Sequence, residues 1–74
     1  MVFVAETEDN RLVIFGNKKE EGYFYIEFTG NVETPRVEKY KLTREVLIEL
    51  LERKLDRYSR KGLNVVFEKM SELD

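Results

Sequence analysis

The clearest signal of the fold is LVIFGNKKEEGYFYIEF, at residues 12–28. It holds two apolar runs separated by a charged segment that begins and ends with glycine, residues 16–22. The second run, Tyr23–Phe28, has the character of a β-strand, because successive side chains of a strand point to opposite faces of a sheet. Glycine and polar residues between two such runs favour a hairpin. The stretch therefore predicts two antiparallel strands, at about 11–16 and 22–29.

Extended segments continue on both sides of this hairpin. Residues 2–7 are rich in apolar side chains, and a polar turn at residues 8–11 connects them to the hairpin. Residues 36–41 have the composition of a further strand at the edge of the sheet. We therefore expect an antiparallel β-meander of three strands, or of four if residues 36–41 pair with the others.

Residues 43–61 carry the pattern of an amphipathic helix. Five apolar side chains recur at a spacing that places them on one stripe of a helix: Leu47, Ile48, Leu51, Leu55 and Tyr58. Thr43 is the expected N-cap, and Gly62 is the expected left-handed residue that ends the helix. One long helix that packs on the meander makes the fold α+β.

The segment after Gly62 permits two interpretations. Residues 63–68 are rich in β-branched and aromatic side chains, which predicts a short C-terminal strand. The alternative is a short helix that runs through Met70 and Leu73. We take the strand as the expectation, within a single small domain over residues 1–74.

The composition argues against catalysis and metal binding. The 74 residues contain no His and no Cys, which are the commonest proton-transfer, nucleophilic and soft metal-binding groups. Neighbouring carboxylates occur in residues 6–9 and at residues 20–21, but both sets lie beside predicted turns, where water solvates them. We expect a protein that is not an enzyme and that carries no cofactor and no metal.

The first residues lack the basic and apolar parts of a signal peptide, and no apolar run is long enough to cross a bilayer. We therefore expect a cytoplasmic protein without membrane contact.

The charges are distributed unevenly, although the formal net charge is only −2. Residues 1–34 carry seven acids and three bases, whereas residues 41–61 carry seven bases and four acids. Five bases share one flank of the predicted helix: Arg53, Lys54, Arg57, Arg60 and Lys61. Val46 and Leu50 lie on the same flank, outside the apolar stripe, which indicates a contact surface. A solvated flank held by ion pairs between neighbouring turns is the alternative interpretation.

One helix can cover only one face of a small sheet. We assign Phe24, Ile26 and Phe28 to the covered face, so Tyr23 and Tyr25 are expected to face away from the helix. Exposed aromatic side chains favour a protein partner, because they contribute much of the binding energy at interfaces. We expect a homodimer.

These features favour a small protein-interaction module of the inhibitor or adaptor type, such as phages and viruses encode, with a partner whose identity the sequence does not give. The expected contact residues are Tyr23, Tyr25, Val46, Leu50, Arg53, Arg57, Arg60 and Lys61. The alternative is a nucleic-acid-binding module, in which the basic flank contacts phosphates and the tyrosines stack on bases.

Overall fold

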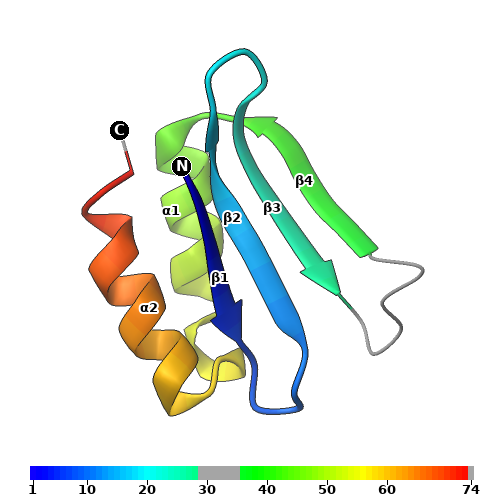
Figure 1. Ribbon diagram of the computed structural model, residues 1–74, viewed down its shortest axis with the longest axis vertical. Helices are drawn as coiled ribbons and strands as arrows, with labels where there is room; N and C mark the ends of the chain where they lie inside the picture. The colour runs from blue at the N-terminus through cyan, green and yellow to red at the C-terminus, as the bar shows by residue number, and fades with distance from the viewer. Residues whose placement is uncertain (29–35, 74) are drawn as a thin grey trace.

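The computed structural model describes residues 1–28 and 36–73, with residues 36–40 described by their backbone. Its strands are β1 (Val2–Glu6), β2 (Leu12–Lys18), β3 (Gly22–Phe28) and β4 (Arg36–Leu42). They form one antiparallel sheet in the order β1-β2-β3-β4 (Figure 1). The expected α+β fold with a β-meander is confirmed, and residues 36–41 do pair as an edge strand. Residue 29, the last of the expected third strand, lies outside the described residues.

The C-terminal part of the chain differs from the expectation. The chain forms α1 (Arg44–Arg53), a short 3₁₀ turn η1 (Leu55–Arg57) and α2 (Arg60–Met70). The single helix over 43–61 is therefore interrupted, and the expected strand over 63–68 is wrong, because these residues belong to α2. The alternative, a helix through Met70 and Leu73, is correct as far as Met70, where α2 ends; Leu73 lies beyond the helix.

The interruption between the helices is held by the end of β1. The backbone N–H of Ser59 donates to the carbonyl oxygen of Glu6 at 3.0 Å, and the N–H of Glu8 donates to the carbonyl oxygen of Arg57 at 3.0 Å. These bonds satisfy backbone groups that a continuous helix would have paired internally. The Ser59 hydroxyl also accepts from the N–H of Gly62 at 3.0 Å and caps α2.

Gly62 is therefore not the end of a helix but part of the first turn of another. It is buried where α2 crosses β1, and a Cβ at this position would overlap the carbonyl oxygen of Glu6. Only glycine allows the two backbones to approach this closely.

The two helices lie on one side of the sheet, and β1 and β2 pass in front of α1 in the view of Figure 1. The hydrophobic core lies between the two layers. It consists of Ala5, Val13, Phe15, Tyr25, Leu47, Leu51, Tyr58, Val66 and Leu73.

The face assignment of β3 is reversed relative to the expectation. Tyr25 is fully buried in the core and Tyr23 packs partly buried against it. The register pairs Tyr25 with Phe15 and Glu27 with Val13, which places these side chains under the helices. Phe24, Ile26 and Phe28 alternate with them and therefore point away from the helices. The charged Glu27 can lie on the inner face because the guanidinium of Arg57 is 2.8 Å from its carboxylate.

Candidate interaction surfaces

The sheet face that points away from the helices is apolar, and we name it the outer face. Alternation along β1, β2 and β3 places seven apolar side chains on it: Val2, Val4, Leu12, Ile14, Phe24, Ile26 and Phe28. Val2, Val4 and Leu12 expose 53%, 49% and 42% of their surface. Soluble monomers rarely leave a large contiguous apolar patch in water. The outer face therefore has the composition of a contact surface.

The ladder registers show how the outer face is organised. One row of paired residues, Val4, Ile14 and Ile26, crosses the three strands in the middle of the face. Phe24, on this face, is only 3% exposed, and the ammonium of Lys18 lies 5.5 Å from the centre of its ring. The face is thus apolar across its middle.

Charged side chains lie at the two ends of the outer face. Glu6 pairs with Leu12 beside the turn between β1 and β2. Lys18 pairs with Gly22 at the opposite end, beside the turn between β2 and β3. The Lys18 ammonium is 3.9 Å from the carboxylate of Glu21, and both side chains are more than half exposed. Glu6 thus lies at one end of the outer face, and Lys18, beside the oppositely charged Glu21, lies at the other.

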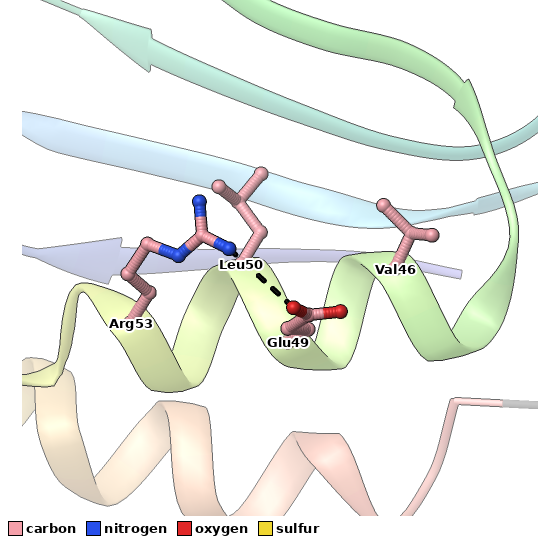
Figure 2. Close-up of a pocket in the computed structure, with 4 residues that line it drawn as sticks. All are labelled: Val46, Glu49, Leu50 and Arg53. Atoms are coloured by element: carbon pink, nitrogen blue, oxygen red, sulfur yellow. Dashed lines mark hydrogen bonds and ion pairs between the residues drawn. The ribbon is translucent and has the colours of Figure 1, made fainter.

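A second candidate surface is a cleft along α1, which we name the α1 cleft. Val46, Glu49, Leu50 and Arg53 line it, and its volume is about 180 Å³. Figure 2 shows Val46 and Leu50 on the side of α1 that is away from α2, while the Arg53 guanidinium donates to Glu49 at 3.4 Å. Sites for small molecules usually measure about 300–1,000 Å³. The α1 cleft is of a size to receive one or two side chains.

A cluster of polar side chains is buried between the sheet and η1. The Tyr25 hydroxyl donates to one carboxylate oxygen of Glu27 at 3.2 Å, and Arg57 donates to the other at 2.8 Å. The Lys54 ammonium lies 5.0 Å from the centre of the Tyr25 ring. Burial raises the pKa of the Tyr25 hydroxyl and of the Tyr58 hydroxyl, so both stay neutral. With both oxygens of Glu27 engaged, the cluster joins η1 to β3.

The eight predicted contact residues do not form one surface. The two tyrosines belong to the inner face, so their expected exposure is wrong for Tyr25 and only partial for Tyr23. Val46, Leu50 and Arg53 do lie together, in the α1 cleft.

The other three predicted bases are separated from the cleft by the interruption of the helix. Arg57 lies in η1 and pairs with Glu27, whereas Arg60 and Lys61 are exposed in the first turn of α2. The expected continuous basic flank is therefore divided among three elements.

The exposed part of the outer face was not among the predicted contact residues. Its signal in the sequence is the apolar character of both faces of the first two strands, as in Val2, Phe3 and Val4 or in residues 12–15. A strand with one solvated face has a polar residue at every second position.

No protein-family model matches this sequence, and no curated protein or solved structure matches it significantly. Among the side chains of residues 1–28 and 41–73, no three acidic groups gather closely enough to hold a metal ion. None of the helices in that part of the chain has the length and apolar character needed to cross a membrane.

Proposed function

We propose that this protein is a non-enzymatic protein-interaction module that binds another polypeptide through its outer face. The observation that carries this proposal is that three apolar side chains of the outer face remain in contact with water. Val2, Val4 and Leu12 are each about half exposed. Removing apolar surface from water contributes about 25 cal/mol per Å². A polypeptide that covers this face recovers that free energy.

The α1 cleft supports the same class of function. Val46 and Leu50 provide an apolar floor, and the ion pair of Arg53 with Glu49 provides a polar rim. An apolar centre with a polar rim is the usual arrangement of a protein interface. The α1 cleft is formed by the helix layer, so an adaptor has a second place for a partner that does not compete with the outer face.

The surroundings of the carboxylates favour a binding protein over an enzyme. Glu27, the buried carboxylate, is neutralised by Arg57 and lies inside the core. Glu49, the carboxylate of the α1 cleft, is 69% exposed and pairs with Arg53. A general acid or base needs a site where its proton can reach a substrate, and neither position provides one.

The nucleic-acid alternative has less support. Stacking on bases requires exposed aromatic rings, but Tyr25 is buried. A phosphate-contacting stripe requires its bases side by side, but Arg57 is engaged by Glu27 and lies on a different element from Arg53. A measured affinity for oligonucleotides that falls steeply between about 50 and 200 mM salt would favour this alternative.

Photocross-linking from the outer face tests the proposal. A photoreactive amino acid at Leu12, on the outer face, is compared with one at Phe67, an apolar residue of α2 that is 58% exposed. We expect illumination in an extract of the host cell to yield a covalent polypeptide adduct from position 12 and none from position 67. No adduct from position 12, or equal adducts from both positions, would contradict the proposal. The inhibitor or adaptor role, a phage or viral source and the cytoplasmic location stay predictions.

A further inference from the structure

We propose that the polypeptide bound to the outer face is a second copy of this chain, so that two sheets pack face to face in a symmetric dimer. This inference rests on the proposed function, since it names the occupant of the same surface. Aligned sheets pack about 10 Å apart with their strands within about 30° of each other, an angle that arises from the twist of each sheet. Two copies of one sheet have the same twist, which favours this packing.

The charges at the ends of the outer face select the orientation of the second copy. A two-fold axis along the strands would place the Glu6 end of each chain on the same end of its partner, bringing like charges together. An axis across the strands reverses the partner, so that Glu6 of one chain lies at the end that carries Lys18 of the partner subunit. The second arrangement brings Glu6 toward Lys18 of the partner subunit, which lies beside Glu21 of its own chain, and it avoids placing the two Glu6 carboxylates at the same end.

This orientation also places the apolar residues in the centre of the interface. The row Val4, Ile14 and Ile26 lies next to an axis that crosses the strands midway between the two charged ends. The two pairs of Glu6 with Lys18 of the partner subunit then form the rim. Each half of the interface is supplied by the same residues, as two-fold symmetry requires.

The small size of the chain favours a second copy as the occupant of the outer face. The molecule measures 30 × 26 × 18 Å, and Figure 1 shows α2 beside β1, so that the sheet occupies only part of the two longer directions. A chain of 74 residues has a small core of its own, so a shared core contributes a large part of its stability.

The solution mass tests the dimer and the surface together. We expect light scattering on the whole chain to give twice the mass of 8.9 kDa. Val4→Lys should return the mass to that of a monomer, with an unchanged far-ultraviolet circular dichroism spectrum, because Val4 is half exposed and a lysine there reaches water. Leu12→Lys is a second variant of the same kind, and Phe67→Lys on α2 is the control that should remain dimeric.

Charge reversal tests the orientation. Glu6→Lys and Lys18→Glu should each weaken the dimer about tenfold, and the double variant should restore the dissociation constant to within about threefold of the parent chain. Lys19→Glu makes the same change of charge in the exposed turn and should have little effect. A double variant that is weaker than both single variants would overturn the orientation.

The failure of this inference is distinguishable from the failure of the proposed function. A parent chain that stays monomeric, or a dimer that survives Val4→Lys, overturns the second-copy inference. If the cross-link from position 12 then joins the chain to a different polypeptide, the proposed function stands and its partner is identified. If position 12 gives no adduct at all, both are overturned.

Discussion

At the scale of single residues, Glu27 shows how a charged side chain is accommodated in a small core. It is 2% exposed, and its oxygens are held by the Tyr25 hydroxyl and the Arg57 guanidinium. A carboxylate without these partners would be too costly to bury. Arg57, in turn, is fixed in η1, so this one ion pair connects the sheet to the interruption between the helices.

Arg57→Ala should therefore be strongly destabilising. It leaves the Glu27 carboxylate buried without its cation, and because Arg57 is itself 39% exposed we expect a loss of about 2–3 kcal/mol, below the full range for buried pairs. The measurement is the free energy of unfolding in urea. Arg53→Ala is the matched control, since its pair with Glu49 is 69% exposed on both sides, and we expect a change below about 0.5 kcal/mol. Equal losses in the two variants would contradict this role of Arg57.

The buried tyrosines predict a loss of stability at alkaline pH. Burial holds the pKa of Tyr25 and of Tyr58 above the ordinary value of 10.0 in the folded chain. As the pH rises past that value, the unfolded chain loses these phenolic protons first, so the unfolded state is favoured. Stability is thus complete below about pH 10 and decreases above it.

Unfolding in urea at several pH values measures this effect. Tyr58→Phe removes one of the two buried phenols, so its free energy of unfolding should decrease less steeply between about pH 9 and 11 than that of the parent chain. Parallel curves for the parent and the variant would show that Tyr58 ionises equally in both states.

At the scale of elements, the contact between α2 and β1 depends on the absence of a side chain at Gly62. A glycine inside a helix normally costs about 1 kcal/mol relative to alanine, because it loses more backbone entropy on folding. Here an added Cβ would overlap the carbonyl oxygen of Glu6, so the helix would have to move away from the strand.

Gly62→Ala should consequently destabilise the protein by about 1–3 kcal/mol, the usual cost of overpacking, despite the better helix propensity of alanine. Asn64→Ala, at an exposed position of α2, is the control and should stabilise by a few tenths of a kcal/mol. Thermal unfolding followed by circular dichroism compares the two. A more stable Gly62→Ala protein would mean that α2 and β1 do not approach this closely.

At the scale of the whole molecule, the sheet has two apolar faces but only one layer of helices. Within the part of the chain that the structure describes, Val2, Val4 and Leu12 of the outer face are left about half exposed. If two copies cover this face for each other, folding and association are coupled, and stability depends on the concentration of the chain.

The temperature of half-unfolding should then rise with protein concentration, by about 5 °C for a tenfold increase in a domain of this size. Differential scanning fluorimetry over a concentration series measures it. The Val4→Lys variant should show a lower temperature that does not depend on concentration. A parent chain whose unfolding temperature is equally independent of concentration would contradict the coupling.

Elements whose signal is local could be predicted from the sequence. The hairpin of residues 12–28 follows from two apolar runs around a glycine-bounded turn, and β2 and β3 pair there. Val46, Leu50 and Arg53 were correctly placed together because they lie on one side of a single helix. For α2 the relevant signal was also present, since Leu63, Val66, Met70 and Leu73 recur at helical spacing. The strand propensity of residues 65–67 obscured it, because propensity is weaker than tertiary packing.

Two features depend on contacts between distant parts of the chain. They are the position at which the expected long helix is interrupted and the face of the sheet that the helices cover. Alternation in β3 separates Tyr25 and Glu27 from Phe24, Ile26 and Phe28, but it does not tell which set is covered. Hydrophobicity favours the second set, whereas the structure places the first set under the helices, where Arg57, 30 residues away in the chain, reaches Glu27. A contact of this kind depends on how β1 holds the interruption between α1 and α2, and no local pattern of residues encodes it.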